Sequence, residues 1–219
     1  MRIGLMECDM NSEAANYQDI LTRAFNHHYN SETDVWTQDI GMRILPLLVK
    51  GKLRFGPETR LLDIGCGSGL DVGVYSPQCL SVEGVDLFAH PEWPKSEAVF
   101  KNVEFKHGDF LNLALEGDYH IIVDNGCFHH QQQSDWPAYL VKIGRLLRET
   151  GTLVLSTFCD DKRTSYTDDN QRIHHYFTDE EFAGLLQENH FKIVDNLYIY
   201  RPRYDNYYRI SFCKKSICI

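Results

Sequence analysis

From residue 60 onwards the chain alternates between short apolar runs and longer polar segments. The apolar runs are nearly continuous rather than alternating, which is typical of strands that are buried on both faces. Such strands form a mostly parallel sheet that is covered by helices. We expect seven strands, at residues 60–64, 81–87, 103–105, 120–123, 152–155, 191–197 and 207–213.

Helical patterns fill most of the segments between these runs. Residues 137–149 carry apolar side chains at helical spacing on one face. Thr178 and Glu181 form a capping box, which predicts a helix over residues 179–188. The last two apolar runs are separated only by residues 198–206, which leaves no room for a crossover helix, so we expect them to pair as antiparallel neighbours.

The N-terminal part of the chain has a different pattern. Residues 12–50 lack strand alternation, and their apolar residues recur at helical spacing. Ser12 is a candidate cap of a first helix, and a second helical stretch runs from about Thr33 to a terminator at Gly51. These residues therefore predict a helical extension ahead of the first strand.

No internal repeat and no linker divides the chain. The sequence predicts one domain over residues 1–219, with the N-terminal helical extension at 1–55 and an α/β core at 56–219. We expect the core to hold a seven-stranded, mostly parallel sheet with an antiparallel C-terminal strand and helices on both faces.

The charge and the cysteines limit the classes of partner. With 22 Lys and Arg against 31 Asp and Glu, the formal net charge is −9, which disfavours general nucleic-acid binding. The seven cysteines are odd in number and form no CxxC pair, so neither a disulfide framework nor a structural zinc site is expected. Free thiols suit a reducing compartment. With no apolar run long enough for a membrane span and no basic-flanked leader, we expect a cytoplasmic protein.

A glycine cluster follows the first predicted strand, in the segment Asp63-Ile64-Gly65-Cys66-Gly67-Ser68-Gly69. Glycine permits a tight turn there and close approach of the backbone to a ligand. The dinucleotide fingerprint would need a further glycine at position 70, where the chain has Leu70. A carboxylate two residues before the first glycine would sit unfavourably near a pyrophosphate. It would suit a ligand that carries a cationic amino group and a sulfonium.

Acidic residues also follow the next two strands. Asp86 ends the second strand, and Asp109 lies in the segment His107-Gly108-Asp109-Phe110 after the third. Each acid alone is typical of a loop cap. Ligands of open α/β sheets bind at the carboxyl ends of the strands, so acids at three consecutive strand ends predict one cluster in that crevice.

These motifs resemble those of a known family. The segment Asp63–Gly69 resembles motif I of the class I S-adenosylmethionine-dependent methyltransferases. The segment 123–130 is similar to the motif IV region of small-molecule methyltransferases of the thiopurine and tellurite-resistance type. The resemblance covers about residues 60 to 213 and implies a Rossmann-like core that binds S-adenosyl-L-methionine.

The resemblance also implies individual roles. Asp86 would grip both ribose hydroxyls of the cofactor, and Asp109 would receive its adenine amino group. One expected cofactor-binding residue, Trp36, lies in the N-terminal extension. The expected residues in the core are Asp63, Gly65, Cys66, Gly67, Gly69, Asp86, Leu87, Gly108, Asp109, Phe110, Asp124 and Asn125.

Methyl transfer from a sulfonium is an in-line displacement, so alignment and desolvation supply most of the catalysis. A base is needed only when the nucleophile carries a proton. His129 and His130, just past the fourth strand, are the candidate catalytic bases, although either can instead be structural. Cys127 is interpreted as a packing residue.

The acceptor is expected to be a small molecule. The motif IV segment lacks the (D/N)PP(Y/F) pattern of adenine amino-methyltransferases, and the acidic charge agrees with that. A protein acceptor, aminopropyl transfer and a non-catalytic S-adenosylmethionine-binding module stay open, because motif I reports the cofactor rather than the reaction. Nothing in the sequence sets the oligomeric state.

Three further patterns have two interpretations each. The polar stretch 160–171 with His174-His175-Tyr176 either lines the acceptor site or is a solvated loop. The aromatic residues of the extension either form a lid over the crevice or pack on the sheet edge. The C-terminal tyrosines either stack on a planar acceptor or pack along an edge strand. These two aromatic sets are Tyr17, Tyr29 and Trp36, and Tyr198, Tyr200, Tyr204, Tyr207 and Tyr208.

Adjacent histidines occur at 27–28, 129–130 and 174–175. Neighbouring side chains point apart on helices and strands, so each pair offers a single ligand. No HxxxH spacing is present, and we expect no metal site.

Overall fold

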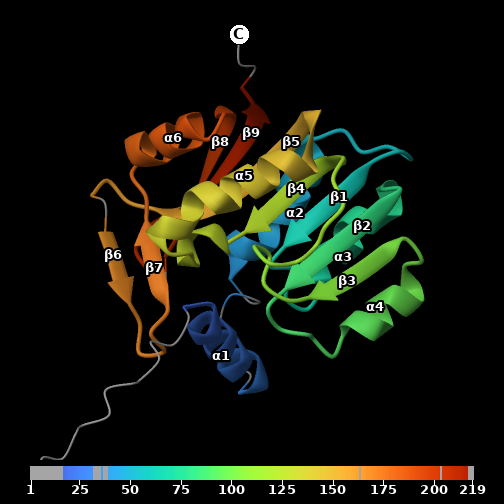
Figure 1. Cartoon of the computed structure of the whole chain (residues 1–219), viewed down its shortest axis with the longest axis horizontal. Coiled ribbons are helices and arrows are strands. Elements are labelled where there is room, and N and C mark those ends of the chain that lie inside the picture. The colour runs from blue at the N-terminus through green and yellow to red at the C-terminus, as the bar shows by residue number, and fades with distance from the viewer. Residues whose placement is uncertain (1–16, 32–35, 37–38, 163, 203, 217–219) are drawn as a thin grey trace, which may run out of the picture.

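The structure is a computed structural model that describes residues 17–31, 36, 39–162, 164–202 and 204–216 (Figure 1). The predicted cap at Ser12 and the predicted helix start near Thr33 lie outside the described residues. No helix within the described part is long and apolar enough to span a membrane.

A seven-stranded sheet forms the centre of the molecule, with the strand order β3-β2-β1-β4-β5-β9-β8 (Figure 1). The strands β1 to β5 pair in parallel, and β9 pairs antiparallel with both β5 and β8. The predicted sheet and its antiparallel C-terminal strand are thus confirmed. The strand bounds are β1 (Arg60–Ile64), β2 (Ser81–Asp86), β3 (Val103–His107), β4 (Tyr119–Asn125), β5 (Leu147–Cys159), β8 (Phe191–Arg201) and β9 (Asn206–Lys215).

Helices cover both faces of the sheet. The α-helices are α1 (Tyr17–Asn30), α2 (Ile40–Lys52), α3 (Leu70–Tyr75), α4 (Trp93–Val99), α5 (Trp136–Leu146) and α6 (Asp179–Glu188). Single 3-10 turns occur at η2 (Ser76–Gln78), η3 (Phe128–His130) and η4 (Gln133–Asp135).

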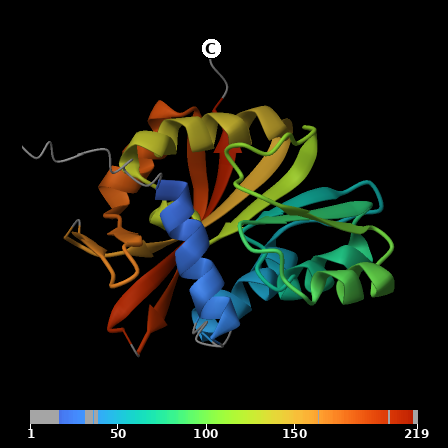
Figure 2. The same ribbon diagram turned by 60° about the horizontal axis from the view of Figure 1, so that its bottom comes forward.

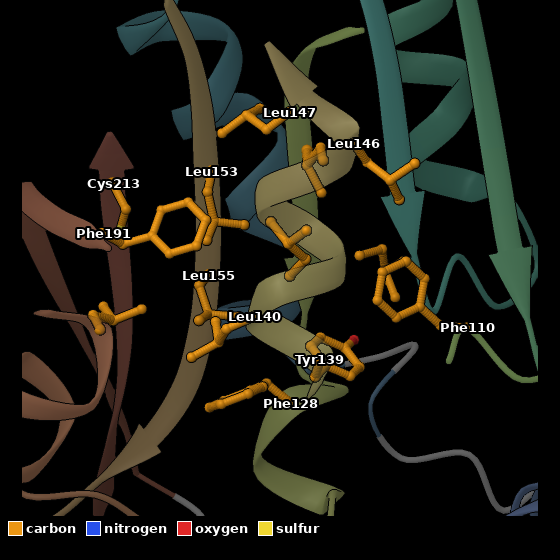
Figure 3. Packing of buried hydrophobic residues seen from close by; sticks show 14 of the residues in the cluster. Phe110, Phe128, Tyr139, Leu140, Leu146, Leu147, Leu153, Leu155, Phe191 and Cys213 are labelled. Carbon is orange, nitrogen blue, oxygen red and sulfur yellow. The ribbon is translucent and has the colours of Figure 1, made fainter. Parts of the chain in front are cut away.

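Successive residues of one strand serve two separate cores. Leu62 of β1 packs in the cluster with α5 and α6, whereas its neighbour Leu61 packs in the cluster with α2 and α3. Ile122 and Ile121 of β4 divide in the same way. This division follows from the two-residue period of a strand and explains the continuous apolar runs. Figure 3 shows the first cluster, where Leu140 of α5 lies among strand side chains.

The predicted helix 137–149 is too long by three residues. α5 ends at Leu146, and Leu147 already has extended backbone and pairs with Tyr119 of β4. The apolar spacing continues through Leu147, which is buried in the strand. Pairing with a strand distant in sequence decided its structure, and helical periodicity cannot detect that partner.

The polar stretch 160–171 is not a simple loop. It contains β6 (Thr164–Thr167), which pairs antiparallel with β7 (Ile173–Tyr176) in a two-stranded sheet. All four β6 residues are exposed, so the strand carries no apolar signal. The capping box, by contrast, is confirmed in part: the Thr178 hydroxyl accepts a hydrogen bond from the Glu181 amide at 3.1 Å.

Candidate active site

A cavity of about 370 Å³ opens at the carboxyl ends of the strands, where open α/β sheets bind ligands. Its wall has two parts. We call the part over β1, β2 and β3 the glycine end, which comprises Gly65–Ser68, Asp71, Asp86, Leu87 and Gly108–Phe110. The part over β5, β7, β8 and β9 is the aromatic end, which comprises His129, His130, Phe158, Tyr166, Asp168, Arg172, His174, Tyr176, Arg201, Tyr204 and Tyr208.

The glycine turn needs glycine because its neighbours leave no room for side chains. Gly65 and Gly67 have φ values of 73° and 53°, in the left-handed region. A Cβ at Gly65 would meet the sulfur of Cys127 at 1.8 Å, and one at Gly67 would meet the Tyr29 hydroxyl at 2.7 Å. The backbone of the turn therefore forms the cavity wall directly.

Asp86 is held beside this turn. Its Oδ2 accepts a hydrogen bond from the Gly67 amide and its Oδ1 accepts one from the Phe88 amide, both at 2.8 Å. Burial raises the pKa of Asp86 to about 6, although these backbone hydrogen bonds oppose the shift. Asp109 also lines the cavity, and burial raises its pKa. Of the three acids predicted to share one crevice, Asp86 and Asp109 line the cavity, whereas Asp63 does not.

Three predicted cofactor residues lie behind the cavity wall rather than in it: Asp63, Gly69 and Asp124. Gly69 packs against Phe105, where its Cβ would meet the ring at 2.5 Å. Asp124 accepts hydrogen bonds from the Cys127 amide at 2.8 Å and the Tyr139 hydroxyl at 2.6 Å, which fixes the turn after β4.

Asp63 lies under the glycine turn and is 1 % exposed. Its Oδ2 has no hydrogen-bond partner among the described residues. Burial raises its pKa well above the ordinary value, and the nearby carboxylates of Asp71, Asp124 and Asp86 raise it further. An isolated buried carboxylate is expensive, so this position favours a cationic group nearby.

Asp71, in the first turn of α3, was missed by the sequence motifs. It lines the cavity and accepts a hydrogen bond from the side-chain amide of Asn125 at 3.2 Å. Burial raises its pKa to about 6, against the opposing effects of Asn125 and Arg43. Its place two residues after the last glycine was the only local signal.

Helix α1 lies across the carboxyl ends of the strands (Figure 2). Its residues Gln18, Leu21, Phe25 and Tyr29 line the cavity. Tyr29 stacks on Phe88 with ring centroids 4.8 Å apart, and its hydroxyl accepts a hydrogen bond from Trp36 at 3.2 Å. Tyr17 does not line the cavity. Its hydroxyl donates to the His130 carbonyl at 2.7 Å and accepts from the Ile173 amide at 2.9 Å. Both ends of α1 are therefore fixed to the cavity wall.

His129 and His130 both line the cavity, and they are 1 % and 7 % exposed. Nδ1 of His130 lies 2.7 Å from the Ile173 carbonyl, which makes Nδ1 the donor and leaves Nε2 as the acceptor of the neutral ring. Nδ1 of His129 has no partner among the described residues. Burial lowers the pKa of both rings well below the ordinary value, and nearby positive groups lower it further, so both are neutral at pH 7.

The β6–β7 hairpin gives both outcomes that its polar sequence left open. Tyr166, Asp168, His174 and Tyr176 line the cavity, whereas His175 faces away, with its Nε2 3.4 Å from a Glu181 oxygen. His174 and His175 therefore diverge, whereas His129 and His130 both line the cavity, with ring centroids 4.3 Å apart. Among the described residues, no group of histidine, cysteine, aspartate and glutamate is arranged to hold a metal ion.

The C-terminal tyrosines divide in the same manner. Tyr204 and Tyr208 line the cavity, whereas Tyr198, Tyr200 and Tyr207 are almost half exposed. Three cavity residues that the sequence motifs did not single out come from distant segments: Phe158, Arg172 and Arg201. No short motif contains them, so no local signal marked them.

A family model described as a methyltransferase domain matches residues 23–196. A solved structure of the 1,6-didemethyltoxoflavin N1-methyltransferase of Burkholderia thailandensis, with its acceptor and S-adenosylhomocysteine bound, is 31% identical. It aligns over 92% of this chain and 89% of that chain with a TM-score of 0.86.

Two further proteins that resemble this chain are described as methyltransferases. An uncharacterised methyltransferase of Schizosaccharomyces pombe is 27% identical over 127 residues, which is 55% of this chain and 83% of that protein. A TehB-like methyltransferase structure from Corynebacterium glutamicum has 16% identity and a TM-score of 0.58 over 91% of this chain and 98% of that one, which shows a shared fold.

The glycine end fits S-adenosylmethionine. Gly65 and Gly67 leave the backbone of the turn uncovered, Asp86 presents a partly buried carboxylate at the wall, and behind it lies Oδ2 of Asp63, which has no partner among the described residues. These are features that a ligand with hydroxyl donors and positive charge would complement. The chain belongs to the methyltransferase domain family, and it is an S-adenosylmethionine-dependent methyltransferase.

Proposed function

We propose that the methyl acceptor is a small molecule that binds at the aromatic end of the cavity. The observation that carries this proposal is the burial of most side chains at that end, where Tyr166 and Tyr204 are the exposed members. Arg172, Arg201 and Phe158 are 7 %, 8 % and 9 % exposed, and Tyr208 is fully buried. An acceptor that reaches them is surrounded by protein, which suits a small molecule better than a folded polymer.

The relative from Burkholderia thailandensis supports this proposal, because its structure holds 1,6-didemethyltoxoflavin, a small molecule. Identity of 31% over 92% of this chain makes a related class of acceptor reasonable without fixing the compound.

We assign direct cofactor contacts to the predicted residues that line the cavity. When bound, S-adenosylmethionine supplies a methyl group on a sulfonium whose departure leaves a neutral thioether. Asp63, Gly69 and Asp124 would act from behind the wall, through charge and through the shape of the turn. The direct contacts are Gly65, Cys66, Gly67, Asp86, Leu87, Gly108, Asp109, Phe110, Asn125 and Trp36.

His129 is the preferred candidate for a proton acceptor. It is neutral, it lines the cavity, and its Nδ1 has no partner among the described residues. His130 is more constrained, because its Nδ1 is bonded to the Ile173 carbonyl. We propose that His129 accepts the proton of the methyl acceptor or orients it. His130, through its bond to the Ile173 carbonyl, would hold the cavity wall in place.

The organisation that follows from this proposal has two parts. Residues 1–55 form the extension, whose described part closes the cavity, and residues 56–219 form the cofactor-binding core. Helix α1 supports the first assignment because Tyr29 and Trp36 both line the cavity. A cytoplasmic location stays a prediction.

The test is a screen of a metabolite extract with methyl-labelled S-adenosylmethionine. A labelled low-molecular-weight product together with S-adenosylhomocysteine would support the proposal. Label in the protein fraction alone would favour a protein methyltransferase. Release of methylthioadenosine would indicate aminopropyl transfer, and cofactor binding without turnover would indicate a binding module.

A further inference from the structure

Two buried arginines face the aromatic end of the cavity, and neither the cofactor nor the proposed base accounts for them. We propose that Arg172 and Arg201 recognise the edges of an uncharged, planar heterocycle that bears carbonyl oxygens. This inference rests on the proposed small-molecule function and names the class of acceptor and the residues that select it.

The first arginine is held by the β6–β7 hairpin. Arg172 donates from Nε at 3.1 Å and from Nη2 at 3.0 Å to Oδ2 of Asp168. Nε2 of His174 lies 3.0 Å from the same oxygen. The guanidinium carbon lies 5.1 Å from the centroid of the Phe25 ring, so an aromatic face from α1 covers it.

The second arginine repeats this arrangement on the β8–β9 side. Arg201 donates from Nε at 3.0 Å and from Nη2 at 2.9 Å to a single oxygen of Asp39. Its guanidinium carbon lies 4.2 Å from the centroid of the Tyr204 ring and 4.8 Å from that of Phe158. Both arginines thus combine one carboxylate with aromatic rings.

In both cases the bonds to the carboxylate come from Nε and Nη2. Within the described residues, this leaves the Nη1 amino group of each arginine available to a ligand. Arg172, Arg201 and His129 line the same cavity, and the Phe158 ring lies 4.8 Å from the Arg201 guanidinium carbon and 3.9 Å from the His129 ring, centroid to centroid in the second case. A ligand beside His129 can therefore be contacted by Arg172 and Arg201 together.

The charges at this end cancel. Arg172 is matched by Asp168 and Arg201 by Asp39. Burial lowers the pKa of His129, His130 and His174, so these rings add no positive charge at pH 7. A phosphate or carboxylate on the acceptor would lose its hydration without gaining an unpaired cation. A neutral carbonyl oxygen can still accept a charge-assisted hydrogen bond.

Four rings of the wall share one orientation and favour a flat ligand, whereas His130 and Tyr208 stand at 89° and 72° to Phe158. Tyr166 and His174 stack at 4.7 Å with planes 3° apart, and Phe158 is inclined by only 9° to His174. Tyr176 lies 5.0 Å from Phe158 with planes 18° apart. Rings that share one orientation provide offset stacking for a planar molecule, as aromatic pairs prefer.

The test measures calorimetric binding at pH 7 to the full chain saturated with S-adenosylhomocysteine. Three planar probes separate the required features. Lumazine is a neutral bicyclic dione, lumazine-6-carboxylate adds an anionic group, and quinoline lacks carbonyl oxygens. We expect lumazine to bind about tenfold or more tighter than either comparator. This ratio corresponds to the free energy of one charge-assisted hydrogen bond.

Two substitutions test the arginines. Arg172→Lys and Arg201→Lys keep the positive charge but remove the forked N–H donors of the guanidinium group. Each should weaken lumazine binding about tenfold or more. The affinity for S-adenosylhomocysteine should not change, which confirms that the variant is folded. Arg148→Lys is the matched control, because Arg148 pairs with Asp118 near the opposite end of β4.

A third substitution tests the charge balance. Asp168→Asn leaves Arg172 without its matching charge, so lumazine-6-carboxylate should gain affinity relative to lumazine. Equal binding of the three probes, no binding of lumazine, or unchanged binding by both lysine variants would overturn the inference. If the extract screen yields a labelled thiol or carboxylate, the inference is wrong and the proposed function stands. Label found only in protein would remove both.

Discussion

The two ends of the cavity are built in opposite ways. The glycine end takes its wall from Gly65 to Phe110, a continuous part of the chain that begins directly after β1 and runs through β2 and β3. The aromatic end joins segments far apart, such as Asp39 with Arg201, 162 residues later. The residues of the glycine end follow successive strands and are close in sequence. The residues of the aromatic end are far apart in sequence and come together only in the tertiary structure.

The two ends also differ in charge. At the glycine end, burial raises the pKa of Asp71 and of Asp86 to about 6. At the aromatic end, burial would raise the pKa of Asp168, but hydrogen bonds from His174 and Arg172 and the charge of Arg172 lower it to about 2. Acids whose burial outweighs their hydrogen bonds suit a cationic ligand, and acids held in ion pairs leave room for a neutral one.

The largest expected effect comes from Gly65→Ala. The new Cβ would collide with the Cys127 sulfur, in a backbone conformation that already strains alanine. We expect calorimetry to give about a hundredfold or greater loss of affinity for S-adenosylhomocysteine, which equals about 2.7 kcal/mol. Gly184→Ala on α6, where nothing lies within 4 Å, should bind normally. Equal affinity of the two variants would mean that the turn does not contact the cofactor.

At the aromatic end, His129→Ala should lower the turnover number about a hundredfold if His129 is a general base. Because the pKa of His129 lies well below its ordinary value of 6.5, the ring stays deprotonated at pH 7, and activity should fall only at lower pH. The variant should lose that acidic limb in a pH–rate profile. His120→Gln, at the opposite end of β4, serves as the control. Full activity with an unchanged profile would make His129 structural.

The glycine end should show its own pH dependence. Asp86 has a pKa raised to about 6, so it takes up a proton below that pH and loses its charge. Affinity for S-adenosylhomocysteine should then fall by up to about tenfold per pH unit below pH 6, the limit for one proton. Asp86→Asn should bind weakly and with a flatter pH dependence. A wild-type affinity that stays constant from pH 8 to pH 5 would contradict the role of Asp86.

The smallest effect is expected where α1 joins the two ends. Tyr17→Phe removes the hydroxyl that bridges the His130 carbonyl and the Ile173 amide, which should lower the free energy of unfolding by about 1–2 kcal/mol. Hydrogen exchange in residues 17–30 should become faster, and added S-adenosylhomocysteine should slow it if α1 is a lid. Tyr198→Phe, an exposed residue bonded to Asp179, is the control. If the exchange rates in α1 do not change when the cofactor product is added, α1 only packs against the sheet edge and is not a lid.

The difference between the ends explains which site residues the sequence could predict. Asp86 and Asp109 were found because parallel strands bring their carboxyl ends to one edge, so a residue's place in the chain fixed its place in space. Asp63 was found for the same reason, yet the structure places it behind the wall, since alternate residues of a strand point to opposite sides.

The sequence by itself determined the seven strands, the antiparallel C-terminal strand and the cap at Thr178. The spacing of apolar residues, a glycine turn and a helix cap each involve residues within a few positions of one another, so the sequence alone predicts them. Only the tertiary structure decided that Leu147 starts a strand, that the polar β6 pairs with β7, and that Arg172 and Arg201 face one cavity. These outcomes depend on pairing with another strand, on contacts such as that of Arg201 with Asp39, 162 residues earlier, or on an exposed strand without an apolar pattern, and none of these leaves a local signal in the sequence.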